Sequence, residues 1–499
     1  MRILIFHGYL LRGTGSNVYN ANLARTLAQL GHDVYLLCQE RHAAELDLPE
    51  RCHVRVPDIG KVLPVYVADR YEGFEAVPFP ELGDAALRHY IEANVAAVRT
   101  VAAEARPDVA LANHLVMGPA ILARGLAGRV PYAVKVHGSA LEYTVRPHPA
   151  RFLPFALEGV RGAAGVLVGS RHTAESLWEV VADEPTLPER TRLGPPGVDV
   201  HAFRRRDPAD AARELGRLAA RLAPGGPAAW GGEAGAAAAL AALDPRRDRI
   251  VGFVGKLIVS KGIDLLLAAW PLVVAQVPDA RLAVVGFGSY RTTLDRFVAA
   301  LGRGDVADLR KIAGRGRELE GGPPGRLRYL DAFLARVGPE WLRTAPAAAA
   351  RVHFTGRLEH SDLPAVLAAC EAHVMPSTFP EAFGMVAAEA AACGALPLSA
   401  AHSGMAEVTA GLAPALPESL RPLLSFRTGP GAVEEIARKL VAWLTLDPAQ
   451  RERARKTLAA AAAQRYSWES VAEGVIAAAE GRLDELPRPA PPGDNLPRP

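Results

Sequence analysis

The sequence predicts an α/β protein with two domains, each built on a doubly wound parallel sheet. The chain has 499 residues, and a single hydrophobic core rarely grows beyond about 300 residues. Short apolar runs that end at glycine alternate with helical segments, which is typical of parallel sheets. This alternation starts at residues 3–6 and starts again at residues 249–255. We therefore expect two α/β halves of similar build.

The N-terminal half begins with a strand that is expected to be buried. Ile3 to Phe6 is a short apolar run bounded by His7 and Gly8, as in strands covered on both faces. A helix over 18–30, closed by Gly31, and a strand over 34–38 follow. Further strands are expected at residues 109–112, 132–136 and 165–168. Residues 1–200 should therefore form the first domain.

The C-terminal half repeats the pattern over residues 249–465. A helix is expected after the first strand, over 262–276. A second helix over 383–393 is closed by Gly394, because glycine suits the position after a last turn. The remaining strands of this half are expected at residues 281–285, 352–354 and 373–375.

Four segments fall outside this alternation. Residues 201–248 are rich in Ala, Gly and Arg, and we expect a linker or insert that is helical at most in its first part. Residues 302–350 form a second insert within the C-terminal domain. A helix over 466–483 is expected to cross back to the first domain. The proline-rich tail 484–499 is expected to be disordered.

Composition and charge are those of an ordinary globular protein. Hydrophobic residues make up 49% and the net charge is +3, so no nucleic-acid partner is expected. The four cysteines lack metal-type spacing, and three lie in apolar surroundings, as in a reducing cytosol. No apolar run approaches the roughly 18 residues of a membrane span. We expect a cytoplasmic protein, and peripheral contact with the inner membrane face stays open.

Two carboxylates flank the start of the helix expected at 383–393. Glu381 precedes the first turn, and Glu389 lies eight residues on, roughly 12 Å along a helix axis. The first turn of a helix leaves N–H groups unpaired at the positive end of its dipole. Such an end can bind a diphosphate. Taken alone, the segment is equally typical of an ordinary surface helix.

Two lysines follow the first strand of the C-terminal half. Lys256 and Lys261 lie in the loop between that strand and its helix, after Gly255. Cations aimed at a departing diphosphate lower the barrier to its release without a metal ion. Taken alone, this loop is more typical of ordinary surface lysines.

A glycine loop and a histidine are candidates in the N-terminal half. Residues 13–17 carry Gly15 just before the first helix, and glycine lets a backbone approach a phosphate closely. The competing interpretation is a dinucleotide-binding fingerprint, with Glu40 as the acid that binds the ribose. In such a fingerprint the glycine loop starts directly after its strand, whereas here seven residues, 7–13, run from the strand end through Gly13. His137 ends a strand before a glycine, where open α/β sheets bind ligands. His114 is a second candidate and His7 a weaker third.

Taken in order, these motifs resemble the retaining glycosyltransferases of GT-B architecture, family 4. The stretch 376–394 resembles the family's Glu-x7-Glu signature, and residues 254–264 resemble its Gly-Arg…Lys-Gly element, with Lys256 where the family has Arg. Further matches at 286–288, 356–358 and 403–407 extend the resemblance over most of residues 1–480. The resemblance implies two Rossmann-like domains that face a cleft.

The resemblance also implies roles for individual residues. Catalysis falls to His137, Lys261 and Glu381, with Glu381 contacting the donor sugar. Glu389 is implied to hydrogen-bond the ribose of the nucleotide. The remaining implied donor-binding positions are Gly15, Lys256, Lys261, Arg357, Phe383, Gly384, Met385 and Val386.

The activity implied by the resemblance is retaining transfer of a sugar from a nucleotide donor. The donor would be a UDP-, GDP- or ADP-sugar, and the acceptor, a glycan, lipid or small metabolite, stays open, as does the oligomeric state. No metal or other cofactor is expected. A sugar-nucleotide epimerase or hydrolase of the same architecture remains an alternative. A non-catalytic nucleotide-sugar-binding protein is a third, which the intact Glu381, Glu389 and Lys261 disfavour.

Overall fold

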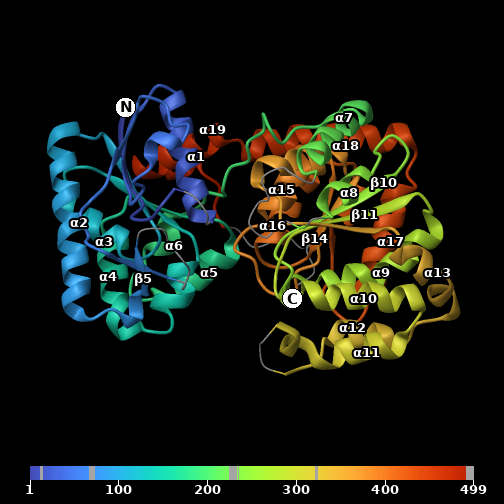
Figure 1. Cartoon of the computed structure of the whole chain (residues 1–499). Coiled ribbons are helices and arrows are strands. Elements are labelled where there is room, and N and C mark those ends of the chain that lie inside the picture. The colour runs from blue at the N-terminus through green and yellow to red at the C-terminus, as the bar shows by residue number, and fades with distance from the viewer. Residues whose placement is uncertain (12–14, 67–73, 224–232, 234, 321–323, 490–499) are drawn as a thin grey trace. The chain divides into compact units, whose positions relative to one another are not determined.

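The computed structural model describes residues 1–11, 15–66, 74–223, 233, 235–320 and 324–489. They form two compact units (Figure 1). Unit 1 comprises Met1–Gly197 and the described residues from Tyr466 onward, and unit 2 comprises the described part of Val198–Arg465. Gly13 and Thr14 of the predicted glycine loop, and the glycine-rich stretch 224–232 of the first insert, lie outside the described residues.

The sheet of unit 1 is parallel, with the strand order β3-β2-β1-β6-β7-β8-β9. Its strands are β1 (Arg2–Phe6), β2 (Asp33–Leu37), β3 (Cys52–Arg55), β6 (Val109–Asn113), β7 (Tyr132–Val136), β8 (Gly165–Val168) and β9 (Thr191–Leu193). The five predicted strands are confirmed. The outer strands β3 and β9 went unpredicted because their short, polar sequences carry no apolar run. A separate pair, β4 (Val62–Val65) and β5 (Glu75–Pro78), is also parallel.

Helices cover both faces of this sheet. Ile3 and Ile5 of β1 share a core with α1 (Gly15–Gln29) and α19 (Trp468–Ala479). Leu4 and Phe6 of the same strand belong to a second core. That core is shared with α2 (Asp84–Ala105), α3 (Gly118–Leu126) and α4 (Pro149–Arg161). Alternate residues of a strand point to opposite faces, so a strand covered on both faces is apolar throughout.

The last α-helix of the described residues, α19, belongs to unit 1. It begins at Ser467, whose hydroxyl accepts a hydrogen bond from the Ser470 N–H at 3.2 Å, the usual N-cap arrangement. Trp468 then packs against Tyr19, with ring centroids 5.4 Å apart. It also lies so close to Gly197 that a Cβ there would come within 2.4 Å of the indole ring.

The prediction of a disordered tail over 484–499 is wrong for the residues up to 489. The Leu193 N–H donates to the carbonyl of Pro487 at 2.8 Å, and Arg192 Nε donates to the carbonyl of Leu483 at 2.7 Å. Leu486 packs against the core below α1. Proline lacks an N–H but keeps its carbonyl as an acceptor, so a proline-rich segment can still be held by hydrogen bonds to its carbonyl groups. Residues 490–499 lie outside the described residues.

The sheet of unit 2 is also parallel, in the order β12-β11-β10-β13-β14-β15. Its strands are β10 (Arg249–Val254), β11 (Ala280–Val285), β12 (Val352–Gly356), β13 (Ala372–Met375), β14 (Leu396–Ala400) and β15 (Ser425–Phe426). The chain runs outward from β10 through β11 to β12 and then returns to the other side of β10 as β13. The strand order therefore reverses between β10 and β13, and open α/β sheets bind ligands at such a point.

The two inserts of unit 2 are helical. Within residues 201–248, the helix α7 (Pro208–Arg221) agrees with the prediction that the first part of this insert can be helical. The helix α8 (Ala236–Ala241) contradicts the prediction that the rest has no helix. Its Ala236 and Leu240 are buried, so packing orders a segment of weak local signal. The insert 302–350 forms α11 (Val306–Arg315), α12 (Arg328–Leu334) and α13 (Pro339–Ala349). None of the described helices is long and apolar enough to cross a membrane.

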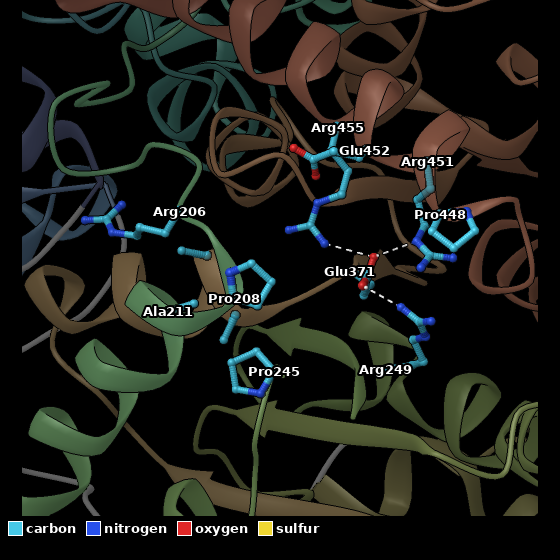
Figure 2. Close-up of a pocket in the computed structure, with 12 residues that line it drawn as sticks. Arg206, Pro208, Ala211, Pro245, Arg249, Glu371, Pro448, Arg451, Glu452 and Arg455 are labelled. Carbon is cyan, nitrogen blue, oxygen red and sulfur yellow. Dashed lines mark hydrogen bonds and ion pairs between the residues drawn. The ribbon is translucent and has the colours of Figure 1, made fainter. Parts of the chain in front are cut away.

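An acidic side chain joins three arginines at the opposite, amino edge of this sheet. Glu371, just before β13, forms ion pairs with Arg249 at 3.2 Å, Arg451 at 3.0 Å and Arg455 at 2.8 Å (Figure 2). These residues line a cavity of about 180 Å³. Arg451 and Arg455 lie on α18 (Pro448–Tyr466), so the cluster fastens that helix to the strands β10 and β13.

We expect Asp264 to make unit 2 less stable as the pH rises. Asp264 lies in the first turn of α9 (Ile263–Gln276) and is 3% exposed, and burial raises its pKa to about 7. An unfolded chain loses this proton near pH 3.8, so between there and pH 7 the folded state holds the extra proton and stability falls. Asp264→Asn should flatten this slope in denaturant unfolding from pH 5 to pH 8. The exposed helix-start variant Asp84→Asn should keep it, and an equal slope in all three proteins would contradict the prediction.

Candidate functional site

The carboxyl edge of the unit 2 sheet gathers most of the predicted donor-binding residues. Lys256 and Lys261 follow β10, Arg357 follows β12, and Glu381 follows β13. The helix α15 (Met385–Ala392) then carries Glu389. The strands β10 and β13 are neighbours, so the loops that carry Lys261 and Glu381 meet at the point where the strand order reverses.

The two loops are fastened to each other by backbone contacts. Gly262 has φ of +66°, and a Cβ there would come within 2.0 Å of the carbonyl oxygen of Pro376. Only glycine accepts both this conformation and this approach. The Thr378 N–H donates to the carbonyl of Ser260 at 2.8 Å, and Ser377 Oγ lies 3.1 Å from the same carbonyl oxygen. The lysine loop therefore has a fixed position beside the glutamate loop.

Lys261 and Glu381 form an ion pair at this junction. The Ser377 hydroxyl donates to Glu381 Oε1 at 2.8 Å, and the backbone N–H of Glu381 donates to Ser403 Oγ at 2.9 Å. The side chains of Lys261 and Glu381 are 28% and 20% exposed. Both charges therefore remain within reach of solvent or a ligand while the loop backbone is held in place.

The helix α15 presents an uncapped N-terminus beside this pair. It begins at Met385, two residues later than predicted, and its cap position, Gly384, has no side chain to bond the first N–H groups. Gly404 approaches the preceding loop so closely that a Cβ would lie 2.6 Å from the carbonyl oxygen of Ala382. The Gly404 N–H also donates to the carbonyl of Glu381 at 2.9 Å. The segment Phe383 to Val386 thus lies at the positive end of a helix dipole, where an anion is favoured.

Glu389 has a partner that the sequence did not indicate. Its carboxylate is 3% exposed, and Oε1 lies 2.8 Å from Nε2 of His360. This hydrogen bond to the carboxylate raises the pKa of His360, because it favours the protonated ring. His360 lies 29 residues before Glu389 in a short 3-10 segment, and no local pattern marks it. One oxygen of the predicted ribose-binding carboxylate is therefore already in use.

The structure also shows supporting residues that carry no motif. His402 lies 2.9 Å from the carbonyl of Ser377 through Nε2 and 3.2 Å from Ser403 Oγ through Nδ1. A carbonyl only accepts, so Nε2 carries the proton. Ser403, with φ of +52°, begins the segment 403–407, for which the sequence predicted no role. These residues hold the Glu381 loop from the side of β14.

The other two predicted basic residues of unit 2 stand apart from the ion pair. Lys256 is exposed, and no hydrogen bond or ion pair joins it to the described part of the chain. Arg357 Nη1 lies 2.9 Å from Glu359 Oε1, and its Nη2 lies 3.1 Å from Glu359 Oε2. Lys256 thus keeps its charge uncompensated, whereas the guanidinium of Arg357 already has a carboxylate partner.

Gly15 and His137 lie in unit 1. Gly15 is the exposed first residue of α1, and a Cβ there would meet nothing within 4 Å. His137 follows β7, and its Nε2 lies 2.8 Å from Asn113 Oδ1. The ring of His114 lies 4.9 Å from that of His137 between centroids, and the ring of His7 lies 6.0 Å from that of His114. The three candidate histidines therefore form one cluster at the carboxyl edge of the unit 1 sheet.

His114 differs from the other two histidines in having no polar partner. It is 2% exposed with φ of +67°, and neither ring nitrogen is hydrogen-bonded to any described residue. Burial holds its pKa well below the usual range, so the ring is neutral. Across the described residues, no group of three or more His, Cys, Asp or Glu side chains is placed to hold a metal ion.

Both units match families of known proteins. The family model described as Glycosyl transferase 4-like domain matches residues 14–187, and the one described as Glycosyl transferases group 1 matches residues 345–458. The first segment lies in unit 1 and the second in unit 2.

Individual proteins of known structure or function are also similar to this chain. A D-inositol 3-phosphate glycosyltransferase from Segniliparus rotundus is 30% identical over 59% of this chain and 48% of its own length. A GDP-mannose-dependent monoacylated alpha-(1-6)-phosphatidylinositol monomannoside mannosyltransferase from Corynebacterium glutamicum is 26% identical over 45% of each chain. The chain thus spans about half the length of these two relatives. The Anabaena protein HepE, solved with UDP, shares the fold with a TM-score of 0.58 at 16% identity, over 97% of this chain and 100% of its own.

The predicted two-domain fold is thus the fold of known GT-B proteins, and each unit carries its own family match. The chain belongs to the GT-B glycosyltransferases, with a Glycosyl transferase 4-like domain in unit 1 and a Glycosyl transferases group 1 domain in unit 2.

Proposed function

We propose that this protein transfers a sugar from a nucleotide diphosphate sugar to an acceptor hydroxyl, with retention at the anomeric carbon. The observation that carries the proposal is the ion pair of Lys261 and Glu381, held beside the uncapped start of α15. A partly exposed cation, a carboxylate and a row of N–H groups meet where the strand order reverses. Each of these groups has a part in such a transfer.

The diphosphate of the donor would lie at the start of α15. Backbone N–H groups and the helix dipole favour an anion there, and Lys261 would turn toward it. A partly exposed lysine–glutamate pair contributes only about 0–1 kcal/mol. A diphosphate with two negative charges can therefore take the ammonium group from Glu381 at little cost. Lys256, exposed and without a carboxylate partner, would add charge from the same loop.

Glu381 would orient the donor sugar once Lys261 has turned away. Its backbone is held by Ser403 and its Oε1 by the Ser377 hydroxyl, so the carboxylate stays in place without the lysine. Charge that develops on the departing diphosphate would be stabilised by Lys261 and the helix N–H groups. The leaving phosphate would then take the proton of the acceptor hydroxyl on the same face of the sugar.

The donor class is supported by relatives and by fold neighbours. The Corynebacterium relative is named as GDP-mannose-dependent, and the Anabaena neighbour was solved with UDP and with UDP-glucose. In this chain Arg357 lies in the loop proposed to hold the base, and Glu389 is proposed to bind the ribose. Gly15 and His137 are the proposed ligand-binding residues of unit 1, which would receive the acceptor.

A panel of UDP-, GDP- and ADP-sugars tests the proposal by calorimetry, with EDTA present throughout. We expect one nucleotide class to bind, and its sugar to be transferred when acceptor hydroxyls are added. Release of free sugar or of an isomer without an acceptor would instead indicate a hydrolase or epimerase. Binding without turnover would indicate a nucleotide-sugar-binding protein, and binding of NAD(H) alone would overturn the proposal.

We expect Glu389→Ala to weaken nucleotide binding by about tenfold. The variant removes two hydrogen bonds that a carboxylate would make to ribose hydroxyls, each worth about 0.5–1.5 kcal/mol. Calorimetry with the nucleotide found in the donor panel measures the change in Kd.

His360→Ala is the matched control for this effect. It breaks the same 2.8 Å contact from the other side and leaves the carboxylate in place. We expect its Kd to stay within about threefold of wild type, because the loss of one partly exposed hydrogen bond is small. An equal loss of affinity in both variants would show that the pair, and not the carboxylate, supports the site.

A further inference from the structure

Four polar side chains form a continuous chain of hydrogen bonds at the carboxyl edge of the unit 1 sheet. His7 follows β1, Asn113 ends β6, His137 follows β7, and Asn20 lies in α1. Nδ1 of His7 lies 3.0 Å from Asn20 Nδ2, Asn20 Oδ1 lies 2.7 Å from Asn113 Nδ2, and Asn113 Oδ1 lies 2.8 Å from His137 Nε2. His7, Asn20 and Asn113 are at most 1% exposed, so water does not compete for the hydrogen bonds among these three residues.

The contacts of His7 determine which groups donate and which accept in this chain of hydrogen bonds. Its Nε2 lies 3.1 Å from the carbonyl oxygen of Leu10, and a carbonyl can only accept, so Nε2 carries a proton. Burial lowers the pKa of His7 to about 4, which leaves the ring neutral near pH 7. Nδ1 therefore has a lone pair and accepts from the amide nitrogen of Asn20.

Two backbone carbonyls determine which way the asparagine amides face. Asn20 Nδ2 also donates to the carbonyl of Ser16 at 2.9 Å, and Asn113 Nδ2 also donates to the carbonyl of Phe6 at 3.3 Å. A flipped amide would bring its oxygen against a carbonyl oxygen in a dry interior, which costs free energy. Each amide thus has one acceptable orientation. Asn113 Oδ1 therefore faces His137, where it can only accept.

We infer that this chain of bonds holds His137 as the imidazole with its proton on Nε2 and a lone pair on Nδ1, and that Asn113 is its positioning residue. The Nε2–H donates to Asn113. None of the described residues hydrogen-bonds Nδ1, which leaves that nitrogen as an acceptor for a hydroxyl group. The neighbourhood supports a neutral ring, because burial and the nearby His114 and Lys135 all lower the pKa of His137.

The inference rests on the proposed function only for the ligand of Nδ1. If His137 faces the donor, its Nδ1 accepts a hydrogen bond from a sugar hydroxyl, and a sugar without that hydroxyl leaves the nitrogen unpaired. With the proton on Nδ1 instead, the ring would offer no lone pair to that hydroxyl. Asn20 and Asn113 would then affect sugar recognition without themselves touching the sugar.

Nitrogen-15 NMR of the full chain with labelled histidine tests the proton position directly. Long-range proton–nitrogen correlations distinguish the two neutral forms of a ring, and His137→Gln identifies the signal of His137. We expect the wild-type ring to carry its proton on Nε2 at neutral pH. Asn20→Leu interrupts the chain of hydrogen bonds without touching His137 and should produce a mixture of both forms, because the Asn113 amide then keeps only its long 3.3 Å bond to the carbonyl of Phe6.

Asn94→Leu is the matched control. Asn94 is another fully buried asparagine of unit 1, and its Nδ2 donates to the carbonyl of Tyr90 at 2.7 Å. It does not belong to the chain of hydrogen bonds that ends at His137. Its loss should leave the His137 signal unchanged. In transfer assays Asn20→Leu should lose about tenfold in kcat/KM, the value of one well-formed hydrogen bond, while Asn94→Leu keeps it.

Two results would overturn the inference. One is a wild-type ring with its proton on Nδ1, and the other is a folded Asn20→Leu variant in which the Nε2–H form stays pure. If that variant does not fold, the wild-type spectrum alone decides. The spectra need neither donor nor acceptor, so the proton position can be confirmed even where the proposed transferase activity fails.

Discussion

Replacing Lys261 with alanine is expected to lower kcat by about 10²–10³, with a much smaller change in donor affinity. Charge grows on the diphosphate as the glycosidic bond breaks, and a cation placed at that charge acts mainly in the transition state. Before the donor binds, Lys261 is paired with Glu381, so part of its attraction to the donor is offset by the loss of that pair. Steady-state kinetics with the donor from the binding panel separate kcat from KM.

Two further variants delimit this result. Lys261→Arg keeps the charge and should recover part of the activity, whereas Lys456→Ala removes a 63% exposed lysine and should leave both constants unchanged. A loss in Lys261→Ala confined to KM would show that the lysine binds ground state and transition state equally. Wild-type kinetics in that variant would remove Lys261 from the site.

Replacing Glu371 with glutamine is expected to destabilise unit 2 by about 3–5 kcal/mol, the usual cost of removing one partner from a buried ionic cluster. The Glu371 side chain is 14% exposed, and those of Arg451 and Arg455 are 5% and 12% exposed. A neutral amide would leave three guanidinium groups around an uncharged centre. Denaturant unfolding at neutral pH measures the change in the free energy of unfolding.

The same cluster has a predictable dependence on pH. Burial pushes the pKa of Glu371 upward, but Arg455, Arg451 and Arg249 outweigh it and hold the pKa below its usual value of 4.5. The stabilisation is therefore complete above about pH 4.5 and is lost as the pH falls through the lowered pKa. Below that pH the wild type should approach the stability of Glu371→Gln.

Glu452→Gln provides the comparison for Glu371. Glu452 lies on the same helix, α18, but its side chain is 42% exposed and pairs with Arg205 at 2.7 Å. An exposed pair contributes about 0–1 kcal/mol, so this variant should stay close to wild type. Equal stabilities for the two variants would show that Glu371 is not the centre on which the helix depends.

The alternation of apolar strands and helices was visible in the sequence because a parallel strand covered on both faces must be apolar throughout. That rule revealed β1, β6, β7 and β10. It missed β3 and β9, which are the two edge strands of the unit 1 sheet. It also missed α8, whose order depends on the burial of Ala236 and Leu240. Local composition signalled flexibility there, and packing overrode it.

The sequence by itself determined the two α/β units, the uncapped start of α15 and the positions of Lys261, Glu381 and Glu389, since strand ends and helix starts follow from local patterns. Only the tertiary structure decided that Lys261 pairs with Glu381 and that Glu389 pairs with His360. It also decided that His137 is bound through Asn113. Hydrogen bonds between residues distant in the chain leave no period or spacing in a sequence. They exist because parallel strands bring their carboxyl ends to one edge, where loops from separate strands meet.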